Sequence, residues 1–169
     1  RMSAYITTLR SVVDDLVRER VQSMAVESTR WCDYSNNSKF EGITFCLPHW
    51  INYSIFDSCM KRFLADVKEA NINKDKIDKL YDYEDIAFCL YQNTEAIEAK
   101  RCYHYIRASI LDEILYNEAK DELKLPAQDA REYLFLGVKS EMYYTGYNED
   151  WNNIIEKRLY DKYGKAHEN

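Results

Sequence analysis

The sequence contains no Cys-x-x-Cys pair, and its 5 cysteines are an odd number. This pattern favours neither a disulfide framework nor a zinc ribbon, and it indicates reduced thiols. No apolar run approaches the roughly 18 residues that a membrane-spanning helix needs. No basic region followed by an apolar one marks a signal peptide. We therefore expect a cytoplasmic protein that does not enter a membrane.

A basic stripe and low-complexity segments are also missing. The 23 lysines and arginines are interspersed with 29 acidic residues, which gives a formal net charge of -6. This mixture disfavours sequence-independent binding of nucleic acid. With 169 residues and 46% hydrophobic content, the chain is long enough to bury a core, and we expect residues 1–169 to form a single domain.

Hydrophobic periodicity predicts a chain in which helices dominate. Helical spacing of apolar residues predicts helices over 8–20, 55–70, 84–123 in two pieces, 126–133 and 148–162. Residues 74–82 are interpreted as a polar helix or a loop. Alternation of apolar and polar residues predicts strands over 43–47 and 134–145, with a further short strand over 4–8 as an option. The predicted fold class is α/β (α+β), with helices packed around a small sheet.

One stretch, "RERVQSMAVESTRWCDYS" at residues 18–35, concentrates arginines and hydroxyl groups. Guanidinium groups bind phosphate through paired hydrogen bonds, and hydroxyls with backbone N–H groups complete such a site. If the chain is extended here, Ser28 and Arg30 point to the same side, toward one anionic ligand. The alternative is that Arg18 pairs with an aspartate one turn back and that the rest is a polar connection. Composition alone leaves both open.

The same stretch resembles the signature of the flavin-dependent thymidylate synthases, usually written RHRxxSxNExSxRY. Trp31 replaces the tyrosine of that signature, and the residues at its fixed positions are Arg18, Arg20, Ser23, Ser28 and Arg30. A second stretch, "DAREYLFLGVKSEMYYTGYNEDWNNIIEKR" at residues 129–158, resembles the other nucleotide-binding region of the family. There an Ala-Arg pair precedes a strand, a Thr-Gly turn and a helix that contains tryptophan and ends in a catalytic arginine.

The resemblance implies an enzyme that makes dTMP from dUMP. Methylenetetrahydrofolate is the carbon donor in this family, and reduced FAD is the hydride source, replenished by NADPH. The family needs no cysteine nucleophile, and no cysteine here lies with a histidine base in a recognisable arrangement. Family active sites form at the subunit interfaces of a homotetramer, so the resemblance also implies a homo-oligomer.

Roles for single residues follow from the same resemblance. It assigns dUMP binding to Glu27, Ser28, Thr29, Arg30, Arg131 and Arg158. It assigns FAD binding to Arg18, Glu19, Arg20 and Asn153. Arg158 is the expected catalytic residue, because a fixed cation stabilises negative charge on the O4/N3 edge of uracil. From the residues alone, the preferred interpretation of Arg158 is a helix C-terminal arginine favoured by the dipole, and that of Arg131 is a surface partner of Asp129. No metal site is expected.

Two departures from the family keep alternatives open. Glu19 stands where the family has a histidine, and a carboxylate there disfavours flavin binding unless Arg18 or Arg20 neutralises it. Family members also have a further N-terminal segment, with a histidine and a serine that contact the flavin, and Met2 is interpreted as a native start behind a residual tag residue. The alternatives are an inactive relative that binds a nucleotide or a protein partner, with a phage-encoded protein as one such case, and an unrelated acidic interaction protein.

Overall fold

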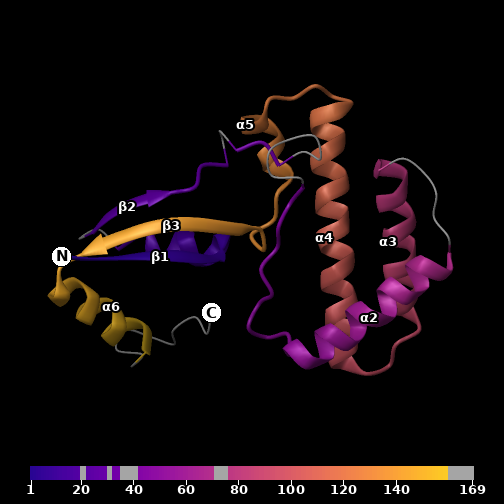
Figure 1. The fold of residues 1–169 in the computed structure, drawn as a ribbon, viewed down its shortest axis with the longest axis horizontal. Coiled ribbons are helices and arrows are strands. Elements are labelled where there is room, and N and C mark those ends of the chain that lie inside the picture. Colours follow the sequence, from indigo (N-terminus) through magenta and orange to yellow (C-terminus); the bar gives the residue numbers. More distant parts are fainter. Residues whose placement is uncertain (20–21, 30–31, 35–41, 71–75, 160–169) are drawn as a thin grey trace. The chain divides into compact units, whose positions relative to one another are not determined.

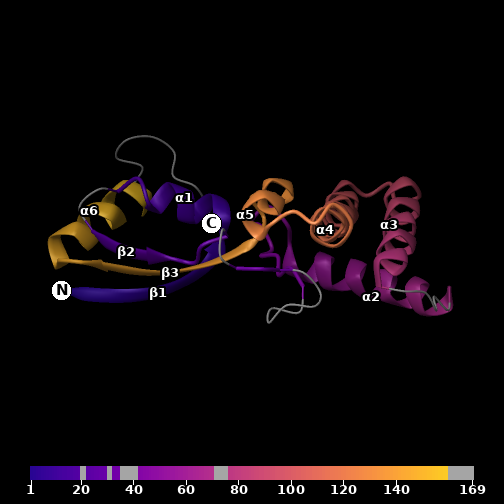
Figure 2. The same cartoon turned by 90° about the horizontal axis from the view of Figure 1, so that it is seen from above.

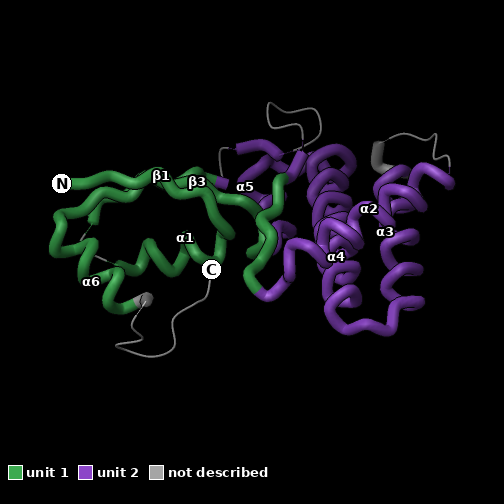
Figure 3. Tube along the Cα trace, turned by 60° about the horizontal axis from the view of Figure 1, so that its bottom comes forward, with its two compact units in different colours: residues 1–28, 44–49, 136–169 green, residues 29–43, 50–135 purple. Residues whose placement is uncertain are grey.

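The computed structural model describes residues 1–19, 22–29, 32–34, 42–70 and 76–159, without the side chains of 76–78 and 158–159. The chain divides into two compact units (Figure 3). Unit 1 comprises Arg1–Ser28, Thr44–His49 and Leu136–Asn169, and unit 2 comprises Thr29–Ile43 and Trp50–Phe135. Each unit therefore joins segments that are distant in the sequence. The single domain over 1–169 stays a prediction.

Unit 1 is built on a three-stranded antiparallel sheet in the order β1-β3-β2 (Figure 1). β1 (Met2–Leu9) pairs along its whole length with β3 (Lys139–Gly146). β2 (Ser23–Val26) pairs with the other edge of β3, from Ser23 opposite Thr145 to Val26 opposite Met142. The central strand therefore comes from the second motif region and one edge strand from the first.

One face of this sheet is covered by α1 (Arg10–Leu16) and α6 (Asn148–Leu159), as Figure 2 shows. Successive side chains of a strand point to opposite faces, and alternate residues of β3 are accordingly buried. The buried core of the unit consists of Val13, Met142, Tyr144 and Ile154. On the opposite face the exposed rings of Tyr5 and Tyr143 lie against each other, with centroids 4.9 Å apart.

Unit 2 is helical. It contains α2 (Tyr53–Glu69), α3 (Lys76–Gln92) and α4 (Ile97–Asp121), which pack against one another, and α5 (Ala127–Ala130) with the 3-10 helix η1 (Arg131–Tyr133), which pack on α4. Asn52 fixes the start of α2, because its side-chain oxygen accepts hydrogen bonds from the backbone N–H groups of Ser54 (2.9 Å) and Ile55 (3.2 Å). None of the helices in the described ranges is long and apolar enough to cross a membrane.

The predicted fold class is confirmed, since helices pack with a small antiparallel sheet. The strand predicted over 43–47 is wrong: in this segment only an isolated bridge forms, between Phe45 and Val138. It is held by two backbone bonds, from Cys46 N to the Gly137 oxygen (3.1 Å) and from Lys139 N to the Thr44 oxygen (2.8 Å). The segment thus pairs only at the beginning of β3, on the same edge with which β2 pairs at residues 142–145.

Candidate active site

The first motif runs from the end of α1 through β2. Backbone pairing continues one residue past Val26, because Glu27 N donates to the Glu141 oxygen at 2.8 Å. The carbonyl oxygen of Glu27 accepts a hydrogen bond from Arg10 Nη1 at 3.3 Å. Glu27 is therefore fixed at the edge of the sheet, and Ser28 follows it as the last residue of this part of unit 1. Arg20, Arg30 and Trp31 lie outside the described residues.

Arg18 lies just beyond α1 and faces solvent. Its Nη1 is 3.4 Å from Asp15 Oδ1, and its side chain is 80% exposed. Pairing of Arg18 with an aspartate one turn back is the alternative to a ligand site that was considered from the sequence. Exposed pairs of this kind contribute only about 0–1 kcal/mol, so an anionic ligand can replace the contact at small cost.

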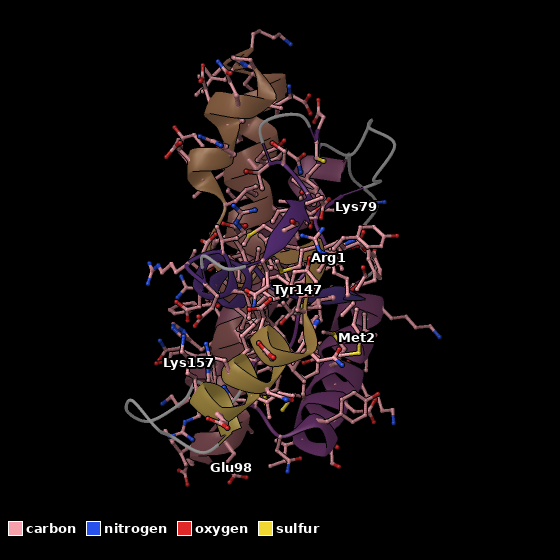
Figure 4. The ribbon with its side chains drawn as sticks, turned by 90° about the vertical axis from the view of Figure 1, so that its left-hand side faces the viewer. Arg1, Met2, Lys79, Glu98, Tyr147 and Lys157 are labelled. Carbon is pink, nitrogen blue, oxygen red and sulfur yellow. The ribbon has the colours of Figure 1, made fainter. Side chains whose placement is uncertain are left out.

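Glu19 pairs with the other end of unit 1. Lys157 Nζ lies 2.9 Å from Glu19 Oε2, and the two side chains are 29% and 16% exposed. The sequence suggests Arg18 or Arg20 as the group that neutralises Glu19. Arg20 lies outside the described residues, and among those described Lys157 of α6, labelled in Figure 4, pairs with Glu19. Because Lys157 directly precedes Arg158, the ion pair joins the first motif to the helix with the expected catalytic residue.

α6 is anchored at its N-terminal end. Tyr147 N donates to Asp150 Oδ2 (2.9 Å), which satisfies an amide before the first turn. The Trp151 ring packs against Tyr144 with centroids 5.3 Å apart, and its Nε1 donates to the Met2 oxygen (3.2 Å). Asn153, expected at the flavin, is half-buried on this helix. The structure does not describe the side chain of Arg158.

Arg131 belongs to unit 2, where it begins η1. Its Nε lies 3.6 Å from Glu132 Oε1, and its side chain is 35% exposed. The pairing with Asp129 considered from the sequence is therefore replaced by one with the adjacent glutamate. The separation is long for a hydrogen bond, so the guanidinium can take another partner.

Asp112 of α4 holds the segment that follows Arg131. Its Oδ1 accepts a hydrogen bond from Phe135 N at 2.9 Å, while the residue is only 6% exposed. Burial raises the pKa of this carboxyl to about 7, the Phe135 bond opposes the rise, and the negative charge of Glu113 adds to it. Asp112 is not among the residues expected from the sequence, although a carboxylate between Leu111 and Ile114 in an apolar helical pattern is a signal that could have identified it.

We predict that Asp112 makes stability fall as the pH rises. The folded state keeps a proton that the unfolded chain, with an ordinary pKa of 3.8, releases. This contribution is complete below about pH 4 and is lost as the pH passes about 7. Asp112→Asn keeps an oxygen for Phe135 N but cannot ionise, so urea unfolding at a series of pH values should show a flatter dependence. Asp57→Asn, in an exposed pair with Lys61, is the control, and an equal effect of both variants would contradict the prediction.

The two units divide the expected site residues between them. Unit 1 holds Arg18, Glu19, Glu27, Ser28 and Asn153, and unit 2 holds Thr29 and Arg131. Sequence reasoning missed Lys157, whose only signal is a positive charge beside Arg158 that matches the unexpected negative charge at Glu19. Within the described ranges, no group of three or more His, Cys, Asp or Glu side chains is arranged to hold a metal ion.

Comparison with known proteins identifies the family of the chain. None of the curated proteins compared with the chain matches it. A family model described as "Thymidylate synthase complementing protein" matches residues 1–166. The match includes both motifs and the helices between them, and it confirms the predicted resemblance. The chain therefore belongs to the thymidylate synthase complementing protein family.

Proposed function

We propose that the chain catalyses the reductive methylation of dUMP to dTMP, with methylenetetrahydrofolate as carbon donor and reduced FAD, replenished by NADPH, as hydride source. The family match over residues 1–166 carries this proposal. The contact that brings the two motifs together is the Glu19–Lys157 ion pair. It joins two motif-bearing segments 138 residues apart in the sequence. Such convergence is what a site assembled from both motifs requires.

The family resemblance assigns the nucleotide to the residues around Ser28 and to Arg131. The hydroxyls of Ser28 and Thr29 and the guanidinium of Arg30 bind the phosphate and sugar, as charge-assisted hydrogen bonds to an anion favour. Glu27 lies beside them on a backbone held by Arg10 and Glu141. Arg131, whose contact with Glu132 is long, adds a second guanidinium.

Arg158 is assigned to the uracil ring. Negative charge develops on the O4/N3 edge during the reaction, and a fixed cation in a site that excludes water stabilises it. The position of Arg158 in the last turn of α6 suits this role, because α6 is anchored on the sheet by Trp151 and Ile154.

The charges of the first motif fit an FAD diphosphate. The Arg18 guanidinium is exposed and only weakly engaged, while the charge of Glu19 is compensated by Lys157. Arg20 and Asn153 complete the residues assigned to the flavin. When bound, reduced FAD supplies the hydride. We further propose a cytoplasmic homotetramer with active sites at subunit interfaces.

The proposal is tested on the purified chain by flavin absorbance and by titration with dUMP. Bound FAD whose spectrum changes on addition of dUMP, followed by dTMP formation with methylenetetrahydrofolate and NADPH, supports the enzyme. Binding of dUMP without flavin supports an inactive nucleotide-binding relative instead. Binding of neither compound contradicts both.

We predict that Arg131→Ala weakens dUMP binding. A lost hydrogen bond to a charged group corresponds to about 1.5–3 kcal/mol, and calorimetric titration measures it. The matched control is Arg62→Ala, which removes an exposed guanidinium that pairs with Asp66 on α2. Equal dissociation constants for the two variants would remove Arg131 from the site.

A further inference from the structure

We infer that Glu19 is a positioning residue, which acts through Lys157 to fix the last turn of α6 and with it Arg158. This inference rests on the proposed function, because it gives Arg158 its role at the uracil. It differs from the flavin contact expected for Glu19 from the family signature. In this inference Glu19 contacts no ligand and helps to position Arg158, which acts on the nucleotide.

The ion pair has the burial that such a role needs. Both side chains are mostly covered, and the Nζ–Oε2 distance of 2.9 Å allows a hydrogen bond as well as charge attraction. The local pairs of Arg18 with Asp15 and of Lys61 with Asp57 have much more exposed cations. Removing one partner of this partly buried pair leaves the other charge poorly solvated and without this partner, which is unfavourable. The Glu19–Lys157 contact therefore constrains both segments.

α6 depends on this contact at its C-terminal end. Its described apolar stripe contains Trp151 and the buried Ile154, three residues apart, whereas Ile155 is 43% exposed. A helical stripe continues three or four residues after Ile154, which are Lys157 and Arg158. The first of these is a lysine, and its ammonium reaches Glu19. Among the described side chains, apolar burial thus holds the earlier turns, and charge holds the turn at Lys157.

The test is a double-mutant cycle with Glu19→Gln, Lys157→Gln and the double variant. Each single variant is expected to lower kcat/KM by about tenfold or more, since small misplacements of a reacting group are costly. The double variant should lose little more than either single one, because both remove the same contact. Lys157→Arg, which keeps the charge, should retain most activity, and Lys61→Gln is the control for loss of a lysine. Additive losses overturn the inference.

One binding measurement and one hydrogen-exchange measurement separate this inference from its rivals. In all variants the FAD affinity should stay within about threefold of the original, whereas a flavin contact at Glu19 predicts weaker FAD binding for Glu19→Gln but not for Lys157→Gln. Amide hydrogen exchange in residues 155–158 should accelerate in both single variants. If the unaltered chain binds no dUMP, the proposed function is wrong. If amide hydrogen exchange is unchanged in the variants, the ion pair does not hold the last turn of α6, and the inference is wrong independently of the function.

Discussion

Replacement of Arg158 by alanine is expected to reduce the turnover of dUMP by about 10²–10³-fold, the usual effect of removing one group that stabilises a developing oxyanion. The loss should appear mainly in kcat, because charge on the uracil edge is present in the transition state and not in bound dUMP. Binding of dUMP should weaken as well, but less. Steady-state kinetics with dTMP formation as the readout measures both effects.

Arg30→Ala supplies the comparison for this prediction. Arg30 is assigned to the phosphate, which has the same charge in the ground state and in the transition state, so its loss should mainly raise KM. Arg101→Ala, at an exposed position of α4, controls for the loss of an arginine without a proposed role. A kcat for Arg158→Ala no lower than that for Arg30→Ala would exclude Arg158 as the catalytic cation.

The helices could be predicted because their apolar spacing is regular. The break between α3 and α4 was expected, and the helical option for 74–82 is correct from Lys76 onward. The helix continues there although it is polar, since Tyr83 packs against Phe63 of α2, with ring centroids 6.3 Å apart. This contact is between distant residues, which a local pattern does not contain.

The strands were harder to predict, since strand formation depends on a free sheet edge. β2 is only Ser23–Val26, too short for a clear alternation, yet it pairs because β3 offers it an edge. The alternating segment at 43–47 has the better pattern but meets β3 only near Val138. The regularity of the apolar–polar alternation therefore does not predict which of these two segments forms a strand.

The two motifs of the site could be predicted from the sequence, but the contacts between their side chains could not. Sequence spacing and resemblance selected Arg18, Glu19 and Arg158, whereas the partner of Glu19 depends on how α6 folds back over the sheet. That placement is set by Trp151 and Ile154 packing against β3. Lys157 could be identified only after this packing was known.

Tyr144→Ala should cause the largest loss of stability of any change considered, about 3–5 kcal/mol for a buried aromatic residue. Tyr144 is 0% exposed, packs between α1 and α6, and contacts the Trp151 ring. Its hydroxyl also donates to Gln22 Oε1, so truncation leaves that oxygen without this donor. Urea unfolding followed by circular dichroism measures the loss.

Tyr143→Ala is the matched control, because the adjacent residue has the same side chain on the opposite face of β3. Tyr143 is 58% exposed and contacts only the exposed side of the sheet through the Tyr5 ring, so its loss should be at most about 1 kcal/mol. Tyr144→Phe keeps the ring and should cost about 1 kcal/mol through the lost hydrogen bond to Gln22. Since α6 rests on Tyr144, the alanine variant should also lose dUMP binding before it unfolds globally. Similar losses at positions 143 and 144 would mean that α1 and α6 do not cover this face.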